Sequence, residues 1–145
     1  MPSRSPLFDP SVASAFFESA GKRERVPAGT KFFVENEKGN RMFFHRDKMY
    51  FVAEGEVGLV HGRETIGTVT QGQIFGEMTA ITQLPRTATA VAKSDCTVIA
   101  LDDKQFRAGL AKQPRFALML MSIMIGRLRE TIGRLRVANG LLGSD

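Results

Sequence analysis

Between Arg23 and about Asp102 the chain is a series of short segments that alternate with turn signals. Each segment is four to seven residues long and has the composition of a strand. Glycines at positions 29, 39, 55, 62, 67 and 72 punctuate this region. In chain order the candidate strands are RERV, KFFV, KMYFVAE, EVGLV, ETIGTVT, TATAVA and CTVIAL. So many strands at such short spacing predict a small antiparallel sandwich or roll.

Helical patterns flank this β region on both sides. Asp9 followed by Pro10 is typical of a helix start, and Gly21 is expected to end that helix. After Leu101 the stretch DDKQFRAGLAKQ has an acidic start and apolar residues at helical spacing. Pro114 then opens a long helix over about 115–138. Within the turns, HGRE predicts a tight hairpin with Gly62 at positive φ.

These patterns predict a mainly β fold with α-helices in a single domain, 1–145. Its 145 residues are enough for one proper core. We expect an N-terminal helix within 1–21, a jelly-roll-like β-roll over 22–102 and two C-terminal helices over 103–139, the last one long.

Signals of an enzyme are weak in this sequence. His45, His61 and the single cysteine, Cys96, do not have metal-ligand spacing. We find no Ser-His-Asp or Cys-His constellation and no P-loop. The net charge of +5 suits an anionic partner, although a solvated basic surface is the simpler interpretation. We therefore expect a protein that is not an enzyme and needs no metal.

The sequence also lacks the marks of a membrane or secreted protein. No apolar run reaches the ~18 residues that span a bilayer, and the N-terminus does not have the pattern of a signal peptide. Because Cys96 is the only cysteine, no internal disulfide can form. We expect a cytoplasmic location and no membrane partner.

The segment FGEMTAITQLPRTATA, residues 75–90, carries one acid, Glu77, and one base, Arg86. It begins as a strand and runs through a glycine into a short helix, whose free N–H groups suit an anion. A guanidinium is a planar fork for phosphate oxygens, whereas a carboxylate repels phosphate and accepts hydroxyl groups. The two ends together predict a clamp for a phosphate and a sugar. The alternative is that Glu77 and Arg86 simply pair with each other, which contributes ~0–1 kcal/mol at a surface.

The segment closely resembles the phosphate-binding cassette of the cyclic-nucleotide-binding domain. That domain occurs in the catabolite activator protein family, in cyclic-nucleotide-gated channels and in regulatory subunits of cAMP-dependent protein kinase. The motif positions that match are Phe75, Gly76, Glu77, Met78, Arg86, Thr87 and Ala88. The stretches PAGT (27–30) and MYFVAEGEV (49–57) and the order of roll and helices are also similar, so the resemblance covers about residues 22–136.

The resemblance implies a role for each cassette residue and no cofactor besides the ligand, cAMP or cGMP. Glu77 would accept the ribose 2′-OH, and Arg86 would bind an exocyclic phosphate oxygen. Backbone N–H groups near Met78 and Ala88, with the Thr87 hydroxyl, would complete the clamp. Phe75 and Gly76 open the motif and are counted with the ligand-binding residues.

In the family that this chain resembles, the long helix covers the base and contributes to the choice between adenine and guanine. Counted from Pro114 as in the catabolite activator protein family, the residue that meets the adenine amino group is Thr131. Its hydroxyl accepts from adenine N6 or donates to guanine O6, so both bases remain open. We favour cAMP; the alternatives are that Thr131 simply faces solvent or that Thr87 makes the choice.

One stretch departs from the family pattern. NRMFFH (40–45) resembles DKMYFV (47–52) at an offset of seven residues. Because strand side chains alternate with a period of two, both copies cannot lie in one continuous strand on the same face. We interpret the first copy, near 40–46 within EKGNRMFFHRD, as an insertion of about seven residues that a turn or bulge separates from the second copy, unless the repeat is a coincidence.

The long helix carries a heptad pattern, which we call the seam. Leu118, Ile125, Ile132 and Asn139 occupy its first position, and Met121, Leu128, Leu135 and Leu142 occupy its second. Isoleucine at the first position with leucine at the second favours a parallel two-stranded coil. We therefore expect a homodimer through 115–138. The alternative is a monomer whose seam packs on its own roll.

No output domain follows the long helix before Asp145. Transcription factors of the family carry a helix-turn-helix there, so we expect no specific DNA binding. The arginines of GRLRETIGRLRVANG are expected to form a charged solvent face. The sequence thus predicts a stand-alone cyclic-nucleotide sensor that signals through its last helix to an unknown effector protein. The alternatives are an interaction scaffold with a lost pocket and the regulatory part of a transcription regulator.

Overall fold

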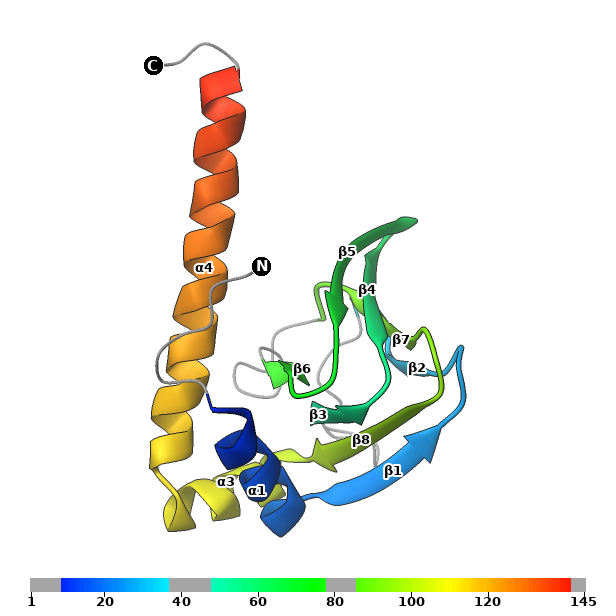
Figure 1. The fold of residues 1–145 in the computed structure, drawn as a ribbon, viewed down its shortest axis with the longest axis vertical. Coiled ribbons are helices and arrows are strands. Elements are labelled where there is room, and N and C mark those ends of the chain that lie inside the picture. Colours follow the sequence, from blue (N-terminus) through cyan, green and yellow to red (C-terminus); the bar gives the residue numbers. More distant parts are fainter. Residues whose placement is uncertain (1–8, 37–47, 78–85, 142–145) are drawn as a thin grey trace.

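The computed structural model describes residues 9–36, 48–77 and 86–141. Figure 1 shows strands folded into a roll beside a long, nearly straight C-terminal helix. The helices are α1 (Pro10–Ala20), α3 (Asp103–Lys112) and α4 (Arg115–Leu141). The strands are β1 (Lys22–Val26), β2 (Lys31–Phe33), β3 (Met49–Glu54), β4 (Val57–His61), β5 (Glu64–Val69), β6 (Ile74–Phe75), β7 (Thr89–Ala92) and β8 (Cys96–Leu101).

The strands form two four-stranded antiparallel sheets. The first has the order β1-β8-β3-β6 and the second β2-β7-β4-β5. Every recorded strand pair is antiparallel, and Gly62 closes the β4–β5 hairpin at φ 63°. The predicted class, mainly β with helices at both ends, is confirmed.

The central strands β3 and β8 separate two apolar cores. On β3, Met49 and Phe51 point toward the helices, whereas Tyr50 and Val52 point toward the second sheet. All six residues of β8 are buried. A strand that is covered on both faces is apolar at every position rather than at alternate ones. This explains why the stretch CTVIAL is apolar apart from Thr97.

The helix ends follow the predicted signals. Asp9 caps α1, and its carboxylate accepts hydrogen bonds from the backbone N–H and the hydroxyl of Ser11. These two bonds hold the pKa of Asp9 below its usual range. At α3 the side chains of Asp102 and Gln105 form a reciprocal capping box.

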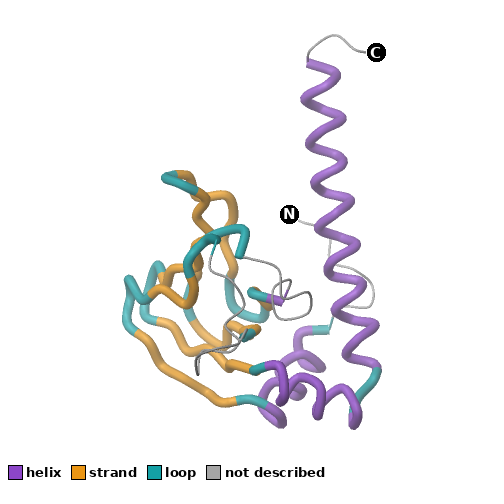
Figure 2. Tube along the Cα trace, turned by 180° about the vertical axis from the view of Figure 1, so that it is seen from behind, coloured by secondary structure: helices purple, strands orange, loops and turns teal. Residues whose placement is uncertain are grey.

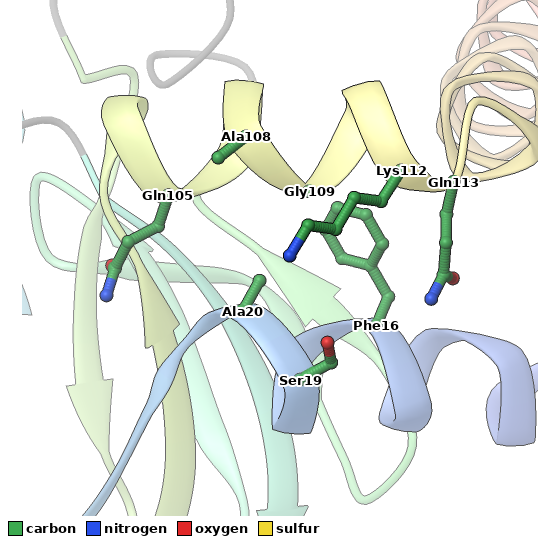
Figure 3. A pocket seen from close by; sticks show the side chains of 8 residues that line it. All are labelled: Phe16, Ser19, Ala20, Gln105, Ala108, Gly109, Lys112 and Gln113. Carbon is green, nitrogen blue, oxygen red and sulfur yellow. The ribbon is translucent and has the colours of Figure 1, made fainter.

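Helices α1 and α3 approach each other closely because a glycine lies at their contact. The ring of Phe16, on α1, stacks on Phe116 of α4 with centroids 3.7 Å apart. A Cβ atom placed on Gly109 of α3 would lie 2.6 Å from Cζ of Phe16. Figure 3 shows the Phe16 ring directed from α1 toward Gly109. Any larger residue at 109 must therefore push the helices apart or displace a buried ring.

We expect Gly109→Val to lower the free energy of unfolding by about 1–3 kcal/mol, the range for overpacking a core. Urea unfolding followed by circular dichroism measures the change. Gly133→Val is the matched control, because Gly133 also lies within a helix but has nothing within 4 Å of an added Cβ. The control should stay within about 0.5 kcal/mol of wild type. Equal losses in the two variants would contradict the packing argument.

Helix α4 packs on the rest of the chain with one side only. Phe116, Met119 and Leu120 are buried against α1 and the first sheet. The described seam residues lie on the other side of the helix and are 43–60% exposed: Leu118, Met121, Ile125, Leu128, Ile132 and Leu135. Figures 1 and 2 show the C-terminal half of α4 extending past α1 and α3. The alternative of a seam packed on its own roll is therefore wrong for these six residues.

The element boundaries agree with the expected ones at most places. The helix expected to follow Asp9 spans Pro10–Ala20, and the long helix begins at Arg115 as predicted but continues to Leu141. The proposed insertion, near 40–46, lies outside the described residues, and Met49–Val52 of the second copy lie in β3. None of the helices in the described ranges is long and apolar enough to cross a bilayer.

Candidate functional site

The cassette begins where β6 ends. Phe75 is the last residue of β6, Gly76 turns the chain at φ 79°, and Glu77 is helical. A positive φ suits glycine because it carries no Cβ. A Cβ at this position would also lie 2.9 Å from the carbonyl oxygen of Lys48 and 3.1 Å from Nη1 of Arg86. Gly76 is therefore needed both for its backbone conformation and for the close approach of Arg86.

Arg86 is held in place by backbone and an aromatic ring. It is only 6% exposed, although it carries a full positive charge. Its Nη1 donates to the carbonyl of Gly76 at 2.9 Å, and its Nη2 donates to that of Lys48 at 3.0 Å. The guanidinium carbon lies 4.0 Å from the centroid of the Phe33 ring, a cation–π contact. These contacts fix the direction of the fork without any ligand.

Glu77 pairs with Arg127 of α4. The carboxylate is 1% exposed, and its Oε1 accepts a hydrogen bond from Nη1 of Arg127. The Nη2 of Arg127 donates to the carbonyl of Ile74 at 2.9 Å. A buried carboxylate is costly unless a cation and hydrogen bonds compensate its charge. The pair therefore joins the cassette to the long helix.

The guanidinium of Arg127 is partly removed from water although 45% of its side chain is exposed. Burial lowers the pKa of Arg127, and the carboxylate of Glu130 opposes this shift. The ordinary pKa of arginine is so high that the group keeps its charge at neutral pH. Arg127 thus presents a permanent cation at the junction of cassette and helix.

The other predicted site residues differ in how they are placed. Phe75 is buried in the core between the sheets, stacked on Tyr50 with centroids 4.8 Å apart. Thr87 is exposed and Ala88 is buried. Thr131 is exposed, and its hydroxyl donates to the carbonyl of Arg127 at 3.0 Å. Met78 lies outside the described residues.

Arg127 is the residue that the sequence reasoning missed. The arginines of α4 were expected to face solvent together, and for Arg127 that expectation is wrong because its guanidinium contacts Glu77. One signal was available. Arg127 stands one helical turn before Thr131, and residues four apart share a helix face. The face of α4 that presents Thr131 to the ligand therefore also carries Arg127.

Two hollows among the described residues lie away from this constellation. One, of about 230 Å³, lies between α1 and α3 and is shown in Figure 3. The other, of about 250 Å³, is lined by Arg25, Glu54 and Asp95 among others. Neither is lined by Glu77 or Arg86. Within the ranges 9–36, 48–77 and 86–141, no group of three His, Cys, Asp or Glu side chains is placed to hold a metal ion.

Known proteins resemble this chain along most of its length. Residues 23–113 match the cyclic nucleotide-binding domain family. The cyclic AMP receptor protein of Thermus thermophilus is 30% identical over 137 residues, which are 87% of this chain and 58% of that protein. The catabolite activator protein of the same organism has a solved structure with a TM-score of 0.76 at 29% identity, over 93% of this chain and 63% of that one.

A further solved structure supports the fold alone. It is a cyclic nucleotide-binding domain from Methylobacillus flagellatus, with a TM-score of 0.70 at 24% identity, over 83% of this chain and 68% of that one. The chain spans less than two thirds of the length of the two Thermus proteins. Domains of this family are typically regulatory rather than catalytic. Because the family match covers more than half of the sequence, the chain belongs to the cyclic nucleotide-binding domain family.

Proposed function

We propose that this protein binds a cyclic nucleotide between the cassette and α4 and acts as a non-enzymatic sensor. The proposal rests on the guanidinium of Arg86, which a hydrogen bond to the carbonyl of Gly76 holds in place, and on the buried carboxylate of the next residue, Glu77. The fork suits phosphate oxygens, and Glu77 suits a ribose hydroxyl. Because its hydrogen bonds already hold the Arg86 guanidinium, less entropy is lost there when the ligand enters.

We take cAMP as the preferred ligand over cGMP. The hydroxyl of Thr131 uses its hydrogen in the bond to the carbonyl of Arg127. Its remaining capacity is that of an acceptor, which suits the N6 amino group of adenine better than the O6 of guanine. The curated relative from Thermus thermophilus also carries cyclic AMP in its name.

The proposed signal passes through the Glu77–Arg127 pair. Arg127 of α4 donates a hydrogen bond to the carboxylate of Glu77. A ribose hydroxyl that binds the same carboxylate would change this contact. A ligand shifts a conformational equilibrium by its difference in affinity for the two states. Contacts to both the cassette and Thr131 would supply that difference and draw α4 toward the cassette. The effector would be a protein that senses the helix, in the cytoplasm.

The proposed assembly is a parallel homodimer through the seam of α4. A continuous row of large apolar side chains is 43–60% exposed along the single chain. Such a row rarely stays uncovered in solution. Its heptad spacing matches a second copy of the same helix.

Glu77→Ala should weaken cAMP binding by about 1–3 kcal/mol, because a hydroxyl–carboxylate hydrogen bond is lost. The same variant should bind 2′-deoxy-cAMP no worse than wild type does, because that ligand lacks the hydroxyl. Calorimetry of wild type and Glu77→Ala with cAMP and 2′-deoxy-cAMP gives four affinities. The effect of the substitution and the effect of the missing hydroxyl should be strongly non-additive. Thermal unfolding without ligand serves as the folding control. Additive losses would show that Glu77 does not contact the ribose, and an absence of cAMP binding by wild type would favour the scaffold alternative.

A further inference from the structure

The hollow of about 250 Å³ is lined by side chains of both charges. The guanidinium of Arg25 and the carboxylates of Glu54 and Asp95 contribute to its wall. Within the ranges 9–36, 48–77 and 86–141, no ion pair joins Arg25 to either carboxylate. Opposite charges around so small a space attract each other. Charges that line one hollow without pairing suit a ligand that carries both signs itself.

The strand register places three of the lining residues in one row across the first sheet. Arg25 of β1 pairs with Thr97 of β8, and Thr97 pairs with Glu54 of β3. Neighbouring strands lie ~4.8 Å apart, so two strand spacings separate the backbones of Arg25 and Glu54 by about 10 Å. The row therefore presents a cation, a hydroxyl and a carboxylate in this order.

Thr97 is an independent sign of a ligand at this place. It is only 6% exposed and is the one hydroxyl-bearing residue of β8. In the described part of the chain its hydroxyl makes no recorded hydrogen bond, yet no fully buried polar side-chain atom there lacks a partner. The hydroxyl must therefore reach the hollow that Thr97 lines. A hydroxyl so nearly buried costs free energy unless it finds a partner, and a ligand in the hollow would provide one.

The carboxylate of Asp95 is held in place by the backbone. Its Oδ1 accepts a hydrogen bond from the N–H of Ala28 at 2.9 Å. An ionised carboxylate has about four acceptor positions on its two oxygens, so this bond leaves room for a cationic donor. Asp95 immediately precedes β8, whereas Glu54 ends β3. Two carboxylates from different elements thus outweigh the single guanidinium of Arg25.

We propose that this hollow binds a basic α-amino acid, with L-lysine and L-arginine as the simplest examples. The ligand carboxylate would lie against Arg25, whose planar fork matches a carboxylate. Its two cationic groups would lie against Glu54 and Asp95, and the Thr97 hydroxyl would donate or accept a hydrogen bond between them. One negative and two positive charges on the ligand complement one positive and two negative charges on the protein. The inference is independent of nucleotide binding, because neither Glu77 nor Arg86 lines this hollow.

Titration calorimetry with L-lysine and its analogues tests the charge pattern. We expect saturable binding of one L-lysine per chain with a dissociation constant below about 1 mM. Cadaverine has both cationic groups of lysine but no carboxylate, so it should bind at least about tenfold more weakly. L-norleucine, which lacks the side-chain cation, should also bind at least about tenfold more weakly. L-glutamate, whose net charge has the wrong sign, should not bind.

Arg25→Met tests the assignment of the ligand carboxylate. It should weaken L-lysine binding about tenfold or more, because the charge-assisted fork is lost. It should not weaken cadaverine binding, because cadaverine has no carboxylate for Arg25 to hold. Arg23→Met is the matched control: Arg23 lies on the same strand and face but pairs with Glu18 and does not line the hollow. The control should keep both affinities within about twofold of wild type.

Thr97→Val tests the hydroxyl, because valine keeps the shape of threonine. The variant should bind L-lysine about threefold to tenfold more weakly. Its urea midpoint should not fall, since the hydroxyl makes no recorded bond within the described residues. A hydroxyl with a merely structural role would lower that midpoint and leave L-lysine binding unchanged. Thr68→Val, at an exposed position of β5, is the control for the substitution itself and should change neither quantity.

Three results would overturn the inference. The first is no saturable binding of L-lysine or L-arginine up to about 10 mM, as expected if the charges are simply solvated. The second is equal affinity for L-lysine and cadaverine. The third is wild-type affinity for L-lysine in both Arg25→Met and Thr97→Val, which would place the bound lysine elsewhere. These titrations contain no nucleotide, so their outcome is separate from that of the cAMP titration.

Discussion

Replacing Arg86 with alanine is expected to weaken cyclic-nucleotide binding by about 2–4 kcal/mol, because a charge-assisted fork to phosphate is lost. Arg86→Lys should recover only part of this loss, since an ammonium keeps the charge but lacks the planar pair of donors. Calorimetric titration of the two variants measures both effects. Arg134→Ala is the control, because Arg134 is an exposed cation whose recorded pairing is to Glu130 on its own helix.

The buried position of Arg86 adds a second consequence. Its alanine variant would leave the carbonyls of Gly76 and Lys48 without these donors and would remove a cation from the Phe33 ring. We expect a loss of about 1–3 kcal/mol in the free energy of unfolding. Urea unfolding without ligand separates this loss from the loss of binding. A variant that binds cAMP like wild type would show that the phosphate is not held by Arg86.

Introducing charge into the seam is expected to give monomers. Leu128→Glu combined with Ile132→Glu removes two large apolar contacts per chain, and each buried aliphatic side chain contributes about 1.5–3 kcal/mol. In a symmetric pair every substitution acts twice, and four new carboxylates would repel each other. Analytical ultracentrifugation of wild type and variant measures the change in mass.

Val137→Glu is the control for this experiment. Val137 is 65% exposed, as apolar and accessible as Leu128 at 58%, but it lies outside the two seam positions. The control should remain a dimer, and all variants should keep the wild-type circular dichroism spectrum because these side chains are exposed within the chain. A wild type that sediments as a monomer at high concentration would refute the dimer.

Local patterns were enough to predict the fold of this chain. Asp9, Pro10 and Gly21 mark the ends of α1, and the carboxyl–amide capping box at Asp102 marks the start of α3. These signals act over a few residues, so they need no knowledge of tertiary packing. The seam of α4 could be predicted because the seven-residue spacing of its apolar side chains follows from the geometry of a single helix.

The contacts between distant elements were harder to predict. The pairing of Arg127 with Glu77 depends on how α4 is rotated against the cassette, and the sequence of either segment does not contain that angle. The same applies to the carbonyl of Lys48, which accepts a hydrogen bond from Nη2 of Arg86, 38 residues later in the sequence. Phe75 was included among ligand-binding residues through its motif, whereas packing directs its side chain into the core.

The most direct test of the central claim is isothermal titration of the wild-type protein with cAMP, cGMP and 5′-AMP. A clamp that holds a cyclic phosphate at Arg86 and a ribose at Glu77 predicts saturable binding of one cyclic nucleotide per chain. It also predicts that cAMP binds more tightly than cGMP and that 5′-AMP binds at least about tenfold more weakly than cAMP, because its dianionic phosphate does not have the ring geometry. No heat and no thermal stabilisation with either cyclic nucleotide would contradict the account.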